Sequence, residues 1–213
     1  MKLHVQFPFF TLGLIIFSYG ISVAIQVQHL GVHPWDVLNI ALFEKFGLTI
    51  GTWAVLVGVV LVGVSFFLDR SYIKMGTFLN ALAVGPLVDL FLYLEIFPQS
   101  SSTFTDVLVL FLGIVLMGIG GGMYSGARIG AGPRDGFMLS ISDKLGMSIS
   151  RVRIMVESIV LLLGWLLGGP VFIFTFVITF IQSPIFQYSY LITTKWSNKL
   201  SAPFKPKKDV RSA

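Results

Sequence analysis

Two ionisable residues lie one helical turn apart inside a long apolar stretch: Arg153 and Glu157, within residues 149–167. An ionised carboxylate in the middle of a membrane span costs roughly 3 kcal/mol on insertion scales, so such a residue is a functional candidate by default. Glu157 therefore suggests an acid that couples transport to protons or contacts a substrate. Two structural alternatives stay open: burial keeps the carboxyl group protonated, or Arg153 pairs with it at i, i+4 spacing.

Other polar residues are also embedded in apolar stretches. Asp89 and Gln187 each follow a proline by three residues, and Asn80 and Gln182 lie nearby in the same two stretches. A proline inside a helix leaves a carbonyl group without its usual partner and loosens the helix there. These four residues are candidates for the wall of a site or for a hinge, although hydrogen bonding between helices is the commoner use of Asn and Gln in membranes.

A Pro-x-Asp motif occurs twice, as Pro34-Trp35-Asp36 and as Pro133-Arg134-Asp135. If each proline begins a helix, the carboxylate of Asp36 or Asp135 lies near unpaired backbone N–H groups, where a capping role is expected. The alternative is that both helix starts line a central site. Arg134 stands where the first motif has Trp35, and it is a candidate either for holding an anionic group or for an anchor to lipid phosphate.

The composition indicates the environment that must position these residues. The chain has 213 residues, 55% of them hydrophobic and only 12% charged, whereas soluble domains have about 25% charged residues. A lipid bilayer is therefore the expected solvent, and a soluble enzyme is excluded. The absence of cysteine excludes disulfides, thiolate metal sites and a cysteine nucleophile.

Six apolar stretches have the roughly 20 residues that a membrane span requires. They are Phe7–Val27, Ile50–Leu68, Gly76–Phe97, Phe104–Gly126, Ile149–Leu167 and Val171–Thr193. Two shorter stretches, Pro34–Phe46 and Pro133–Leu145, begin with Pro and are followed by Gly, which is typical of helix starts and ends. We expect them to be short helices that do not cross the membrane alone.

The two halves of the chain match each other at turn and cap residues. Gly31, Pro34, Asp36, Lys45, Gly47 and Ile50 align with Gly130, Pro133, Asp135, Lys144, Gly146 and Ile149. The sequence thus predicts a duplication in which each half contains a span, a short helix and two further spans. The expected units are residues 1–97, residues 98–194 and a basic, disordered cytoplasmic tail over residues 195–213.

The positive charges predict the topology. With six spans and both termini inside, every Lys and Arg except Lys45 falls on the cytoplasmic side, as the positive-inside rule favours. If the two short helices also crossed, Arg70, Lys74, Arg128 and Arg134 would move outside. Three spans per half invert the second half relative to the first, so we expect an all-α polytopic membrane protein with two inverted three-helix repeats.

The motif Gly31-Val-His-Pro34-Trp-Asp36 and its repeat from Gly130 to Gly136 resemble the YczE/YyaS/YitT group of bacterial integral membrane proteins, especially its YczE branch. The resemblance covers nearly the whole chain up to the basic tail. It implies a bacterial cytoplasmic-membrane protein, with exporter-like or secondary-metabolite-related roles. It implies no catalytic or binding residues.

Inverted repeats with short helices are a recurring plan of secondary transporters. We therefore expect a small transporter, such as an exporter, that acts as one unit or as a homodimer on an unknown small molecule. The alternative is a non-transporting membrane partner that positions a biosynthetic or signalling complex. We expect no enzymatic activity, no cofactor, no metal and no nucleic-acid partner. His29 and His33 imitate metal-ligand spacing, but the intervening Gly31 breaks the helix face.

Overall fold

All regular structure in the described residues, 3–94 and 102–201 of a computed structural model, is helical. The all-α expectation is thus confirmed for this part of the chain. The elements are α1 (Leu3–Ile25), α2 (Pro34–Phe46), α3 (Ile50–Leu68), a 3-10 turn η1 (Arg70–Tyr72), α4 (Met75–Tyr93), α5 (Thr103–Gly126), α6 (Pro133–Leu145), α7 (Ile149–Leu166) and α8 (Ile173–Ser201).

Three of these helices are long and apolar enough to cross a membrane by themselves: His4–Ile25, Met75–Tyr93 and Thr103–Gly126. Helix α3 contains a somewhat shorter apolar stretch, Thr52–Leu68. Helix α8 continues to Ser201, so the first residues assigned to the tail are helical. The predicted end of the third span at Phe97 and the tail beyond Ser201 lie outside the described residues.

The short helices α2 and α6 have the bounds that their sequences predict. Each has Pro at its first position, and the chain leaves each helix at a glycine with positive φ, 74° at Gly47 and 62° at Gly146. Glycine adopts this left-handed region without the steric cost that a Cβ atom would add. Both helices therefore begin with a proline and end at a glycine.

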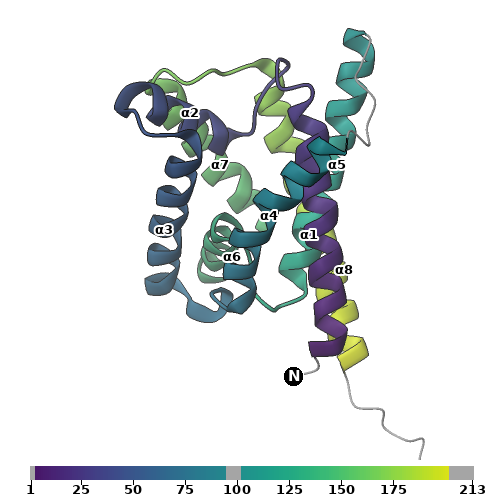
Figure 1. Cartoon of the computed structure of the whole chain (residues 1–213). Coiled ribbons are helices and arrows are strands. Elements are labelled where there is room, and N and C mark those ends of the chain that lie inside the picture. Colours follow the sequence, from purple (N-terminus) through teal and green to yellow (C-terminus); the bar gives the residue numbers. More distant parts are fainter. Residues whose placement is uncertain (1–2, 95–101, 202–213) are drawn as a thin grey trace, which may run out of the picture.

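Glycines allow helix α5 to pack closely against two neighbours. A Cβ atom at Gly20 of α1 would lie 2.7 Å from the backbone nitrogen of Met117, and one at Gly118 would lie 2.7 Å from the side chain of Ile185 in α8. Such distances leave no room for a methyl group. This close packing brings α1, α5 and α8 together along one side of the molecule (Figure 1).

Helix α3 stands on the opposite side of the molecule in Figure 1, and the short helices make cross-contacts between the halves. Helix α2 packs on α7, and α6 packs on α3. At the first of these contacts, a Cβ atom at Gly164 would lie 2.9 Å from the backbone nitrogen of Leu38. Residues from the beginnings of α2 and α6 line one cavity together with residues of α1, α7 and α8.

Candidate functional site

A cavity of about 410 Å³ lies where the first turns of the two short helices meet. Its wall includes the side chains of Asp36 from α2, Arg134 and Asp135 from α6, Arg153 from α7 and Gln182 from α8. Five of the sequence-predicted site residues, which come from both halves of the chain, therefore line one cavity. Charged groups gathered in the interior of an apolar protein mark a functional site by default.

Arg153 is at the centre of a buried ionic cluster. Its Nη1 lies 2.5 Å from Oδ1 of Asp135, and its Nη2 lies 3.0 Å from Oε1 of Glu157. Glu157 is 0% exposed, Arg153 3% and Asp135 7%. The i, i+4 pairing that the sequence left open is thus present, and one arginine binds two carboxylates. Tyr124 of α5 donates a further hydrogen bond to Oδ2 of Asp135.

Two buried polar atoms of this cluster have no hydrogen-bond partner among the described residues. They are Oε2 of Glu157 and Nε of Arg153. A buried polar atom without a partner costs free energy, which a ligand or a proton at this site would recover. The guanidinium also lies over the ring of Phe186, with its Cζ 4.0 Å from the ring centroid. Packing against this ring fixes the position of Arg153 next to the cavity.

The start of α2 faces this cluster from the other half of the chain. His33, the residue before the helix, places its Nε2 3.9 Å from Oε1 of Glu157. Nη1 of Arg134 lies 3.9 Å from Oδ1 of Asp36, and its guanidinium lies 5.3 Å from the ring centroid of Trp35. Arg134 thus bridges the first turns of α6 and α2, across the cavity that both line.

The carboxylates of Asp36 and Asp135, in the first turns of α2 and α6, each have an arginine partner. Neither α2 nor α6 has a side-chain hydrogen bond at its N-cap, and each carboxylate lies next to a guanidinium group. Each aspartate also lies in the first turn of its helix, where its carboxylate compensates the positive end of the helix dipole, so the capping interpretation stays open beside the ion pair. The positive end of each helix dipole therefore lies at the cavity, next to the aspartate of its own first turn.

The remaining sequence-predicted residues have different surroundings. Asn80 is buried in α4 beside the segment that leads into α6, where its Oδ1 would lie 2.8 Å from a Cβ atom at Gly132. Gln187 accepts a hydrogen bond of 2.7 Å from the backbone N–H of Ser150 at the start of α7. Asp89 is exposed on α4 and is not part of the cavity wall. These residues are therefore not all brought together.

Sequence reasoning missed three residues of this site: His33, Trp35 and Tyr124. His33 and Trp35 directly flank Pro34 in the repeated motif. Their position next to this motif is the sequence feature that could have identified them as site residues. Tyr124 lies in the glycine-rich stretch of α5 and carries no comparable signal. Within residues 3–94 and 102–201, no three His, Asp or Glu side chains are arranged to hold a metal ion.

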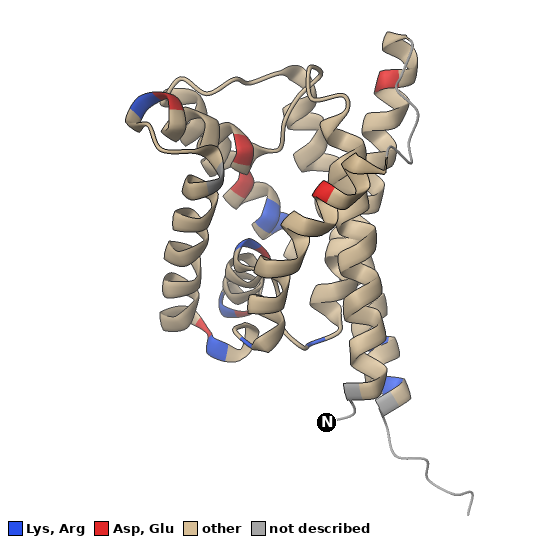
Figure 2. Cartoon of the chain, viewed as in Figure 1, with Lys and Arg blue, Asp and Glu red and all other residues tan. Residues whose placement is uncertain are grey.

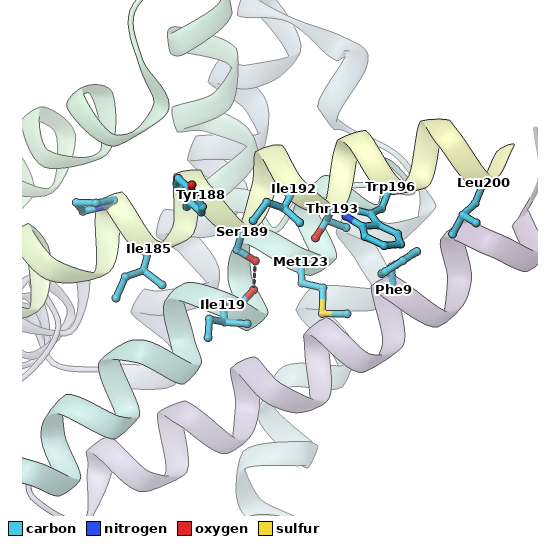
Figure 3. A pocket seen from close by; sticks show the side chains of 11 residues that line it. Phe9, Ile119, Met123, Ile185, Tyr188, Ser189, Ile192, Thr193, Trp196 and Leu200 are labelled. Atoms are coloured by element: carbon cyan, nitrogen blue, oxygen red, sulfur yellow. Dashed lines mark hydrogen bonds between the residues drawn. The ribbon is translucent and has the colours of Figure 1, made fainter. Parts of the chain in front are cut away.

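A larger cavity, about 870 Å³, lies along α8 beside α1 and α5 (Figure 3). Its wall is apolar apart from hydroxyl groups, and the hydroxyl of Ser189 donates a 2.6 Å hydrogen bond to the carbonyl oxygen of Ile119. Figure 3 shows Trp196 and Phe9 together at one end of the cavity. No charged residue lines it. The smaller, charged cavity is therefore our candidate site.

Residues 5–190 match a family described as "Family of unknown function (DUF6198)". The chain belongs to this family. The "Uncharacterized membrane protein YczE" of Bacillus subtilis is 36% identical to it over 188 residues, which cover 88% of this chain and 86% of that protein. The resemblance to the YczE branch is thus confirmed, and this DUF6198 member is a membrane protein.

Two further relatives of this DUF6198 protein are similarly uncharacterised. The "Uncharacterized protein YyaS" of Bacillus subtilis is 30% identical over 167 residues, covering 78% of this chain and 83% of that protein. An "Uncharacterized protein" of Haemophilus influenzae is 32% identical over 169 residues, covering 76% and 74%. No solved structure matches the chain. The function must therefore be argued from the site.

Proposed function

We propose that this protein is a small transporter of the bacterial cytoplasmic membrane and that the charged cavity is its substrate site. The observation that carries the proposal is the meeting of two short helices, one from each half of the chain, around buried charged residues. Secondary transporters bind substrates at such interfaces between inverted repeats, where helix ends face the ligand. A soluble export substrate, such as a secondary metabolite, would reach the cavity from the cytoplasm.

The pattern of helix contacts supports the inverted repeat. The contacts of α1 with α4 and of α2 with α7 have counterparts in those of α5 with α8 and of α6 with α3. Exchanging the two halves of the chain therefore maps each of these contacts onto another. We propose that residues 1–97 and 98–194 are the two repeats.

Helix lengths and charges support six spans with both termini in the cytoplasm. Helices α3 and α7 have 19 and 18 residues, or about 27–29 Å at 1.5 Å per residue, close to the thickness of the hydrocarbon core. The start of α1 and the end of α8 lie at the same end of the molecule (Figure 1), and Lys and Arg gather toward that end (Figure 2). The positive-inside rule favours placing that end in the cytoplasm.

Glu157 is the residue that we propose couples transport to protons. Its carboxyl group is fully buried, shares Arg153 with Asp135 and keeps one oxygen without a hydrogen-bond partner. A proton on Glu157 would neutralise its carboxylate, weaken its ion pair with Arg153 and change the charge around the cavity. The protonated and ionised forms of Glu157 would then favour different conformations of the protein, one with the site open to the inside and one with the site open to the outside.

Flux through reconstituted protein tests this function. Purified protein in proteoliposomes is given a mixture of small organic acids, amines and neutral metabolites under an imposed pH gradient, and the lumen is analysed by mass spectrometry. We expect at least one compound to accumulate above protein-free liposomes, and the Glu157→Gln variant to lose its dependence on the gradient. Glu44→Gln, on the exposed end of α2, is the matched control. Unchanged pH dependence in Glu157→Gln would remove the coupling role.

A second candidate function, a membrane partner that positions another protein, is favoured by Asp89. This carboxylate is exposed on α4 among exposed apolar side chains that include Phe78 and Leu82. A carboxylate that faces lipid is costly, so a second copy of the chain or another membrane protein would shield it. Crosslinking from Asp89→Cys in membranes tests this, and a partner that crosslinks in the absence of any flux would favour the second function.

A further inference from the structure

The charges around the cavity nearly cancel when the helix ends are counted. Arg134 and Arg153 contribute two positive charges, and Asp36, Asp135 and Glu157 contribute three negative charges if all are ionised. His33 and Tyr124 also face the cluster and count as neutral. The uncapped starts of α2 and α6 each add about half a positive charge. The sum is then about zero, and about +1 when Glu157 holds a proton.

The buried atoms without partners include hydrogen-bond donors in the cavity wall. Nε1 of Trp35 and Nε of Arg153 have no acceptor among the described residues, and these side chains are 2% and 3% exposed. Oε1 of Gln182 is an acceptor without a partner, but an amide presents either its oxygen or its nitrogen to a ligand. A ligand with acceptor oxygens would accept hydrogen bonds from the indole N–H of Trp35 and from the Nε–H of Arg153.

Arg134 is the cation that is available to such a ligand. Arg153 already binds two carboxylates at hydrogen-bond distance. Arg134, in contrast, lies 3.9 Å from Asp36, and the side chains of Arg134 and Asp36 are 30% and 50% exposed. An ion pair with this exposure is weak. The guanidinium of Arg134 can therefore exchange Asp36 for another anion without breaking a buried pair.

Apart from Gln28 and His33, the rest of the wall is apolar. Phe17 and Ile21 of α1, Met117 of α5, Met138 of α6 and Ile178 of α8 line it. The volume of about 410 Å³ falls in the range of about 300–1,000 Å³ that is typical of small-molecule sites. Methionine and aliphatic side chains adapt to apolar groups of different shape, so the wall accepts a hydrophobic body of that size.

We infer that the cavity binds an organic monoanion with an apolar body, such as a carboxylic acid, and this inference rests on the proposed function. The carboxylate would lie between the first turns of α2 and α6, bound by Arg134 and by the indole N–H of Trp35. The hydrophobic body would pack against the apolar wall. A proton on Glu157 would offset the charge of the ligand, so that the loaded site stays close to neutral.

Three probes of the same size but different charge test this ligand class: phenylbutyrate, phenylbutyramide and phenylbutylamine. Their binding to the purified full-length protein in lipid nanodiscs is measured by calorimetry and by the shift in thermal unfolding midpoint. We expect phenylbutyrate to bind at least about tenfold more tightly than the other two. Arg134→Ala is expected to remove that preference, while Lys144→Ala, on the exposed end of the same helix, keeps it.

The other outcomes are equally informative. Tighter binding of the amine, equal binding of all three probes, binding of none, or unchanged selectivity in Arg134→Ala would each overturn the inference. Arg134→Lys, which keeps the charge, shows whether a loss in Arg134→Ala reflects charge and not misfolding, because it is expected to retain a preference for the anion. Selective binding of phenylbutyrate without its flux in proteoliposomes would contradict transport and leave the ligand class standing.

Discussion

Arg134 in α6 lies 3.9 Å from Asp36 in α2, and the pair joins the first turns of the two short helices. These residues occupy neighbouring positions of the repeated Pro-x-Asp motif. The contact therefore connects the two halves of the chain at the cavity that both line. Because both side chains are partly exposed, the contact is suited to breaking and re-forming more than to holding the fold.

We predict a weak energetic coupling between Arg134 and Asp36. In a double-mutant cycle of Arg134→Ala and Asp36→Ala, the coupling should be about 0.2–1 kcal/mol, as for other partly exposed pairs. The measurement is the free energy of unfolding in mild detergent, and both single variants should remain folded. A coupling above about 2 kcal/mol would show instead that the pair is a structural brace.

Arg153 should behave in the opposite way, because it binds two buried carboxylates, Asp135 and Glu157. Arg153→Ala leaves both buried carboxylates without their arginine, with only the Tyr124 hydroxyl still bonded to Asp135, and we expect a loss of about 3–5 kcal/mol or a failure to fold. Arg151→Ala, on the exposed face of the same helix, is the control. Equal unfolding midpoints for these two variants would contradict the ionic cluster.

The role of charge at this cluster can be separated from folding. Glu157→Gln keeps the shape of the side chain and one acceptor oxygen, and Arg153 retains Asp135 as a partner. We therefore expect Glu157→Gln to remain folded, with an unfolding midpoint closer to that of the unsubstituted protein than to that of Arg153→Ala. This comparison makes Glu157→Gln usable in the flux measurement.

The short helices could be predicted from sequence because their boundaries depend on local residues. Proline at the first position and glycine after the last specify a helix start and end without any tertiary contact, and α2 and α6 have the predicted bounds. The end of α8 could not be set in this way, since no proline or glycine stops the helix at Thr193 and it continues to Ser201.

Which residues form the site depends on tertiary packing, and the spacing of residues in the sequence does not encode that packing. The i, i+4 spacing of Arg153 and Glu157 offered their pairing as one alternative, but the addition of Asp135 and Tyr124 requires α6, α7 and α5 to meet. Asp89 lies in the same kind of apolar stretch as Glu157, yet its direction around α4 places it outside the cavity. Hydrophobic periodicity does not distinguish a lipid-facing position from a cavity-facing one in an almost uniformly apolar helix.

The close contact of α1 with α5 should be sensitive to a single methyl group. A Cβ atom at Gly20 would lie 2.7 Å from the backbone nitrogen of Met117, so Gly20→Ala must push the helices apart. We expect a loss of about 1–3 kcal/mol, typical of overpacking. Gly63→Ala in α3 is the control, because a Cβ atom there meets nothing within 4 Å and alanine favours a helix. A loss in Gly63→Ala as large as in Gly20→Ala would contradict the packing argument.

Tyr72 should make stability depend on alkaline pH. Its hydroxyl donates a 2.6 Å hydrogen bond to Asp143, which ties η1 to α6. Burial, and then this hydrogen bond, raises the pKa of the Tyr72 hydroxyl. Because the folded pKa lies above the unfolded value of about 10, the contribution is fully present below that pH and is lost as the pH rises above it.

The test for Tyr72 compares unfolding midpoints at pH values of about 8 and 10.5 in detergent. Tyr72→Phe should lower the midpoint at the lower pH, since it removes a hydrogen bond that contributes about 1 kcal/mol. At the higher pH its deficit should shrink. Tyr93→Phe, at a site that is 84% exposed, corrects for the general effect of alkali, and a deficit that stays constant with pH would count against the raised pKa.

The inverted topology that we propose predicts that the far ends of α2 and α6 lie on opposite sides of the membrane. Lys45 and Lys144 are exposed near those ends and occupy equivalent positions in the two halves. The chain has no cysteine, so Lys45→Cys and Lys144→Cys each supply one thiol. A membrane-impermeant maleimide applied to intact cells should label Lys45→Cys alone, and permeabilised cells should show both. Labelling of both in intact cells, or of Lys144→Cys alone, would contradict two inverted repeats of three spans, because an odd number of crossings is what separates these residues.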